Sequence, residues 1–99
     1  VLLVDNASTD DSRPQLHRAI EERGWNGWVQ LISAERNAGF SAGNNLAIRK
    51  LLASPRPPEY VWLLNPDTVV RPGAAAELLE FLDAHPRVGI VGSRLEDAD

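Results

Sequence analysis

The stretch YVWLLNPDT, residues 60–68, decides which fold the sequence predicts. Its first five residues are apolar or aromatic throughout. Such a run is too short for a helix of its own and favours a strand buried on both faces. Pro66 lacks the N–H that a sheet ladder needs and disfavours helical backbone at Asn65, so the strand should end there. We therefore expect Asn65 and Asp67 at the carboxyl edge of a sheet, where open α/β sheets bind ligands.

Asp67 admits two interpretations. A carboxylate fixed by a strand and a proline turn suits a divalent metal that takes oxygen ligands. Asp67 is also an ordinary residue for an Asx turn that caps a helix beginning near Pro72. The stretch by itself leaves both interpretations open.

Short apolar runs alternate with amphipathic segments along the rest of the chain. Pro14 suits the first turn of a helix, and Gly24 suits the left-handed residue that follows a helix. This alternation predicts an α/β fold with three layers, in which helices cover a mainly parallel sheet. The expected strands are 1–5, 28–33, 60–64 and 88–91, and the expected helices are 12–23, 41–53 and 72–85. The helix residues expected to face the sheet are Leu16, Ala19, Ile20, Ala47, Ile48, Leu51, Leu52, Ala75, Leu78, Leu79 and Leu82.

Composition narrows the class of protein. A chain of 99 residues supports one small domain or part of a larger one. A net charge of −4, with Lys50 as the only lysine, argues against a nucleic-acid partner. The absence of cysteine excludes disulfides and thiolate metal sites. Because Val1 already lies inside a strand-like run, we expect the sequence to be cut from a longer protein.

Polar residues follow the expected strands at one edge of the sheet. Parallel strands place their carboxyl ends together, so Asp5, Asn6 and Asp10 should lie near the loop 35–40 and the turn 65–68. Carboxylates with a metal beside them suit a ligand that carries phosphate. The Asp5 carboxylate can instead accept hydrogen bonds from a nucleobase or from ribose hydroxyls.

Three residues near this edge have a structural and a functional interpretation each. Gly39 is either an ordinary turn glycine or a point where the backbone approaches a ligand closely. Asn44 and Asn45 lie in a helix that alanine would favour. They indicate either hydrogen bonding to a ligand or capping of the helix.

Three motifs resemble those of the family 2 glycosyltransferases, and among these the rhamnosyltransferase-like members. The motifs are VDNASTDDS at 4–12, RNAGFSAGNN at 36–45 and LNPDT at 64–68. The resemblance implies a GT-A fold, which is Rossmann-like, and it implies that residues 1–99 are the nucleotide-sugar-binding part of a catalytic domain truncated at both ends. It also implies inversion at the anomeric carbon.

The resemblance assigns roles to individual residues. Asp5 would hold the nucleobase, and Asp67 would ligate Mg or Mn at the diphosphate. Asn65 stands where many members have a first aspartate, so the metal should be held more weakly. The residues implied to bind the nucleotide sugar are Asp5, Asn6, Asp10, Arg36, Asn37, Gly39, Asn44, Asn45 and Asn65. No residue can be assigned as the catalytic base, because the acidic Glu96, Asp97 and Asp99 follow the last expected strand too closely.

The function that follows is metal-assisted transfer of a sugar from a dTDP or UDP donor to a glycan or lipid-linked acceptor. The resemblance implies a cytoplasmic protein, with peripheral association at the cytoplasmic face of the membrane as the alternative location. Uncovered sheet surface predicts marginal stability or self-association. The alternative function is a nucleotide-binding module without catalysis. A receiver-like phosphoacceptor domain is disfavoured, because it needs a lysine at a strand end and Lys50 lies in an expected helix.

Overall fold

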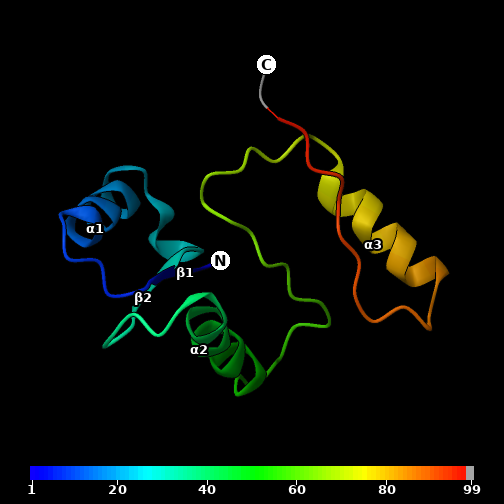
Figure 1. The fold of residues 1–99 in the computed structure, drawn as a ribbon, viewed down its shortest axis with the longest axis horizontal. Coiled ribbons are helices and arrows are strands. Elements are labelled where there is room, and N and C mark those ends of the chain that lie inside the picture. Colours follow the sequence, from blue (N-terminus) through cyan, green and yellow to red (C-terminus); the bar gives the residue numbers. More distant parts are fainter. Residues whose placement is uncertain (98–99) are drawn as a thin grey trace. The chain divides into compact units, whose positions relative to one another are not determined.

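The computed structural model describes residues 1–97, and the chain divides into two compact units, Val1–Leu63 and Leu64–Asp99 (Figure 1). The fold class is α/β, as predicted. In chain order the elements are β1 Leu2–Asp5, α1 Ser12–Glu22, the 3-10 helix η1 Trp25–Gly27, β2 Gln30–Ser33, α2 Phe40–Leu52 and α3 Ala74–Ala84. Among residues 1–97, every helix falls short of the length and apolar character that a bilayer span requires.

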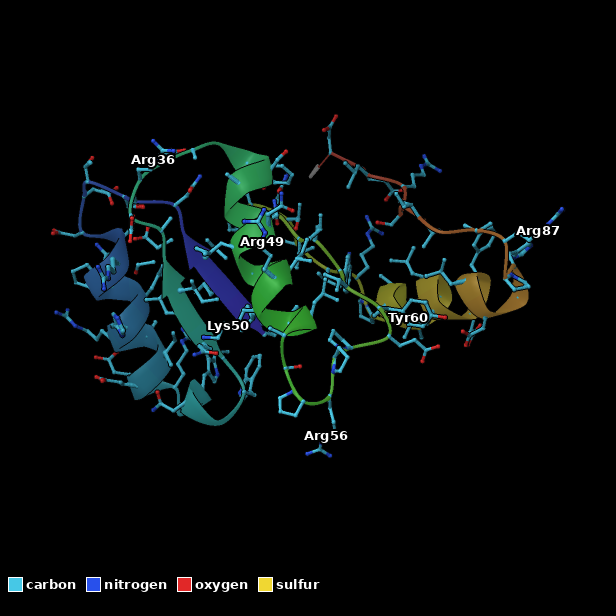
Figure 2. The ribbon with its side chains drawn as sticks, turned by 90° about the horizontal axis from the view of Figure 1, so that it is seen from below. Arg36, Arg49, Lys50, Arg56, Tyr60 and Arg87 are labelled. Atoms are coloured by element: carbon cyan, nitrogen blue, oxygen red, sulfur yellow. The ribbon has the colours of Figure 1, made fainter. Side chains whose placement is uncertain are left out.

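The first unit is built on the parallel pair β1 and β2. Leu2 pairs with Gln30, and the register runs on to Asp5 opposite Ser33. The two strands lie between α1 and α2 (Figures 1 and 2). Helix α2 packs against β1. This arrangement places the end of β1 and the loop before α2 at the same edge of the sheet.

Helix α1 follows its sequence signals closely. Pro14 lies in the first turn, where a missing N–H costs little. Gly24 adopts a left-handed conformation with φ 66° and donates its N–H to the Glu21 carbonyl at 3.1 Å, which ends the helix. Ile20 is 7% exposed and anchors the helix, while Leu16 and Ala19 are half-buried. The predicted apolar stripe of this helix is therefore confirmed.

Helix α2 begins after Gly39, whose φ of 91° is a conformation that favours glycine. Ala47, Ile48 and Leu51 are half-buried as expected. Leu52 was expected on the same face but is 61% exposed, because it is the last residue of the helix.

Two of the four predicted strands are not present in the described residues. The segments 60–64 and 88–91 have no regular secondary structure, and the sheet contains only β1 and β2 among residues 1–97. Exposed fractions from Tyr60 to Leu64 rise from 39% to 52%. A segment becomes a strand only when its backbone forms hydrogen bonds with a neighbouring strand. An apolar run shows that the side chains suit a buried strand, but it does not show that a neighbouring strand is present.

The second unit contains α3 and two extended segments. The helix begins after Gly73, whose φ is 86°, rather than at Pro72. At its other end the His85 ring stacks on Phe81 at 4.1 Å, and His85 Nδ1 lies 2.7 Å from the Phe81 carbonyl. Of the residues expected to face the sheet, Leu78 and Leu82 are half-buried, whereas Ala75 and Leu79 are exposed. The residues of this unit that the structure describes, 64–97, form no sheet that could cover them.

The segment after 88–91 forms ion pairs through Glu96. Arg71 forms an ion pair with Glu96 at 2.8 Å, and Arg94 lies 3.6 Å from the same carboxylate. Glu96 is therefore paired with arginines at the surface of this unit. Asp97 is exposed, and Asp99 lies outside the described residues.

Candidate functional site

The site begins where β1 ends, at Asp5. The Asp5 side chain is 5% exposed, although it is charged. Its Oδ1 accepts a hydrogen bond from the Ser8 N–H at 3.2 Å, which closes a turn directly after the strand. No hydrogen bond from residues 1–97 reaches its Oδ2. This oxygen is not among the buried atoms without a partner in residues 1–97. It is therefore open to a hydrogen-bond donor from water or from a ligand.

The turn after β1 contains an unusual backbone conformation. Ala7 has φ 61°, a left-handed value that residues with a Cβ rarely adopt. The hydrogen bond from the Ser8 N–H to Asp5 Oδ1 spans this residue. A left-handed alanine in a loop next to a candidate site fits the tendency of functional sites to hold such conformations.

Asn6 connects the end of β1 to the loop that precedes α2. Its Nδ2 donates to Asn37 Oδ1 at 3.0 Å and to the Gly39 carbonyl at 3.2 Å. Asn37 Oδ1 also accepts the Gly39 N–H at 3.0 Å, and the Gly39 carbonyl also accepts the Gly43 N–H at 3.1 Å. We call this set, Asn6, Asn37 and Gly39, the amide bridge. It brings together three residues that the sequence predicted to share a site.

Gly43 belongs to the site and was not singled out from the sequence. It is the one buried residue of α2. A Cβ at this position would lie 3.5 Å from Asn6 Cγ and Oδ1. The helix backbone therefore lies directly against the Asn6 amide. The available signal was a glycine inside an otherwise regular helix, where it weakens the helix unless packing requires it.

Asp10 has a structural partner within its own loop. Its Oδ1 accepts the Ser12 N–H at 2.9 Å, at the start of α1. Hydrogen bonds from the side chain and the backbone of Ser12 lower the pKa of Asp10 below its ordinary value of 3.8. The neighbouring Asp11 is the N-cap residue but makes no side-chain cap hydrogen bond. Asp10 thus stabilises the beginning of α1.

The remaining predicted residues of the first unit lie on or near α2. Arg36 is exposed on the loop between β2 and α2 (Figure 2). Asn44 Nδ2 donates back to the Phe40 carbonyl at 2.9 Å, a bond within the helix. Asn45 is exposed. The structure joins none of these three to the amide bridge by a hydrogen bond.

Asn65 and Asp67 lie in the second unit, in a turn that forms where Pro66 predicted one. The Asn65 carbonyl accepts the Thr68 N–H at 3.3 Å and the Thr68 hydroxyl at 2.7 Å. Both residues are exposed. Residues 1–97 contain no group of three or more metal-ligating side chains. A lone carboxylate still fits Mg²⁺, which proteins often bind through one or two carboxylates together with substrate phosphates.

The fold places the chain among α/β proteins with a parallel sheet, and comparison with known proteins gives the family. Residues 1–99 match the model of Glycosyl transferase family 2, so the chain belongs to this family of glycosyltransferases. Membership implies, in general terms, a nucleotide-sugar donor and an acceptor. No curated protein and no solved structure matches the chain.

Proposed function

We propose that the chain is the donor-binding part of an inverting glycosyltransferase. The enzyme would transfer a sugar from a nucleoside diphosphate to a hydroxyl of a glycan or lipid-linked acceptor. Family membership supports the transferase class. The observation that carries the donor assignment is the Asp5 carboxylate, which is 5% exposed and has one oxygen without a partner among residues 1–97.

Asp5 is suited to the nucleoside rather than the diphosphate. A carboxylate only accepts hydrogen bonds, and it repels phosphate oxygens. The imide N–H of uracil or thymine and the ribose hydroxyls are donors that its free oxygen would accept. Bonds to an ionised acceptor in a largely dry site are among the stronger hydrogen bonds in proteins. This residue would therefore fix the position of the nucleoside.

The loop before α2 is suited to the charged part of the donor. Arg36 brings a guanidinium, which can donate two parallel hydrogen bonds to phosphate oxygens. Asn37 and Gly39 would line the same pocket. Asp10, Asn44 and Asn45 are the further donor-binding residues proposed in the first unit. Asn65, in the second unit, is proposed to bind the donor on the resemblance of its motif alone.

Asp67 would hold Mg or Mn, with the amide oxygen of Asn65 as an additional neutral ligand. When bound, the ion would neutralise charge on the departing diphosphate as a Lewis acid. In the reaction a base takes the proton of the acceptor hydroxyl, whose oxygen bonds to the anomeric carbon as the diphosphate oxygen leaves with its electron pair. Residues of this chain bind and orient the donor, and none is assigned as the base.

The finer assignments rest on the three motifs at 4–12, 36–45 and 64–68. Asn65 in place of a first aspartate supports a rhamnosyltransferase-like subtype with a dTDP or UDP donor. A cytoplasmic location, at or near the membrane face, is part of the same proposal.

Calorimetric titration of the chain with UDP and dTDP, with Mn²⁺ and with chelator, tests the proposal. Wild type should bind UDP or dTDP more tightly with Mn²⁺ than with chelator. Asp67→Ala should bind the same nucleotide with equal affinity in Mn²⁺ and in chelator. Asp97→Ala removes an exposed carboxylate from the same unit and should behave as wild type. Equal responses to chelator in wild type and Asp67→Ala would remove the metal role from Asp67. Because no base is assigned in this chain, sugar transfer is tested in the full-length protein. Metal-dependent nucleotide binding there without transfer to any acceptor would favour a non-catalytic module.

A further inference from the structure

The Asn6 amide has only one possible orientation. Its Nδ2 faces two acceptors, Asn37 Oδ1 at 3.0 Å and the Gly39 carbonyl at 3.2 Å. A rotated amide would set Oδ1 against two other oxygens and lose both bonds. The side chain is therefore committed to the amide bridge.

The other end of this amide is closed to a ligand. Asn6 Oδ1 is buried and has no hydrogen-bond partner in the described part of the chain. The backbone of α2 covers it, since a Cβ on Gly43 would lie 3.5 Å from that oxygen. An unpaired buried acceptor lowers stability. Burial of the unpaired Oδ1 offsets part of the stability that the two Nδ2 hydrogen bonds provide. We therefore look for the role of Asn6 in the loop that its Nδ2 binds.

The Nδ2 end holds both parts of the loop that carries Arg36. Through Asn37 it holds the residue next to Arg36, and through the Gly39 carbonyl it holds the first turn of α2. Asn37 Oδ1 accepts the Gly39 N–H as well, so the loop is pinned at both ends by one amide pair. Asn37 Nδ2, by contrast, makes no hydrogen bond within residues 1–97 and is left available.

We propose that Asn6 is a positioning residue, which fixes the loop 36–39 against the end of β1 so that Arg36 and Asn37 meet the diphosphate, while Asn6 itself touches no ligand. This inference rests on the proposed function. It separates two neighbouring residues by role: Asp5 contacts the nucleoside directly, and Asn6 acts only through the loop.

Asn6→Asp tests the inference, because the change keeps the shape of the side chain and replaces the donor by an acceptor facing two oxygens. Loss of two hydrogen bonds should weaken UDP or dTDP binding about tenfold, while binding of uridine or thymidine, which lack phosphate, should change less. Amide exchange at Gly39 should accelerate. Asn26→Asp makes the same substitution in η1, remote from the bridge, and should leave affinity and Gly39 exchange unchanged.

A double-mutant cycle distinguishes positioning from direct contact. If Asn6 acts through Arg36 and Asn37, adding Asn6→Asp to the Arg36→Ala/Asn37→Ala pair should weaken binding by less than about twofold, since coupled residues are not additive. Asn6→Ala removes the bridge without adding charge and should give the same result if the aspartate variant does not fold. The inference would be overturned if the affinity losses of Asn6→Asp and of the Arg36→Ala/Asn37→Ala pair multiplied in the combined variant. Equal affinity losses for nucleoside and nucleoside diphosphate in Asn6→Asp would also overturn it. So would unchanged diphosphate affinity in Asn6→Asp. Absence of nucleotide binding by the wild type would overturn the proposed function, and the inference with it.

Discussion

Replacing Asp5 by asparagine should separate binding from stability. In the folded chain this carboxylate is 5% exposed and has a single hydrogen bond, from the Ser8 N–H at 3.2 Å. Asparagine keeps an oxygen for that bond and removes a buried charge. The variant should therefore unfold within about 1 kcal/mol of wild type, or be more stable.

The affinity of the Asp5→Asn variant for the nucleotide, unlike its stability, should fall. A hydrogen bond to a charged acceptor contributes about 1.5–3 kcal/mol, which corresponds to a loss of about 10- to 150-fold in affinity for UDP or dTDP. The loss should lie toward the upper end, because the amide of the Asp5→Asn variant would present an N–H where the ligand also has a donor. The dependence on Mn²⁺ should remain, since the metal is assigned to Asp67.

Calorimetry for the affinity and thermal unfolding for the stability measure both quantities on one sample. Asp11→Asn is the matched control, because it changes an exposed aspartate on the same segment that makes no cap hydrogen bond. Unchanged affinity in Asp5→Asn would refute direct contact with the nucleoside. A drop in stability as large as the drop in binding would show that the carboxylate serves the fold instead.

Further predictions concern packing, titration and association. Gly43→Ala should raise the unfolding free energy by about 0.5–1 kcal/mol, because alanine favours a helix over glycine and its Cβ would lie at an ordinary contact distance of 3.5 Å from Asn6. A lower melting temperature would mean that packing against Asn6 requires glycine. The lowered pKa of Asp10 contributes stability that is fully present above its ordinary value of 3.8 and is lost as pH falls through the folded pKa. The stability difference between wild type and Asp10→Asn should therefore vanish at low pH, and NMR titration should place the pKa of Asp10 below 3.8. The apolar run 60–64 should promote self-association, so Leu63→Lys should lower the sedimenting mass while Leu95→Lys, at a residue 83% exposed outside the run, should not; a wild type that is monomeric at all concentrations would contradict this.

The elements that the sequence predicted well are those whose signals are local. Pro14 and Gly24 bound α1 within one residue of expectation, because a helix makes its hydrogen bonds within its own segment. The segment 60–64 carried the strongest apolar signal and formed no strand, since a strand depends on a partner elsewhere in the chain.

The site divides in the same way. The position of Asp5 follows from the abrupt end of an apolar run, which the sequence displays directly. The amide bridge joins Asn6 to Asn37 and Gly39, which lie 31 and 33 positions further along the chain. No local sequence pattern specifies that Asn6 should bind these two residues. The role of Gly43 depends on the packing of its helix against Asn6, which is a tertiary contact that the local sequence does not specify.

The parallel pairing of β1 with β2 has a consequence for how the site assembles during folding. Every pairing from Leu2–Gln30 to Asp5–Ser33 encloses all of α1 and η1, so the sheet cannot zip outward from a hairpin. Contacts between distant residues require loop closure first and therefore form slowly. The Asp5–Ser8 turn is local and should appear early, whereas the amide bridge must wait for the whole crossover. In a stopped-flow refolding experiment, helical signal should return before the chain regains its ability to capture a nucleotide.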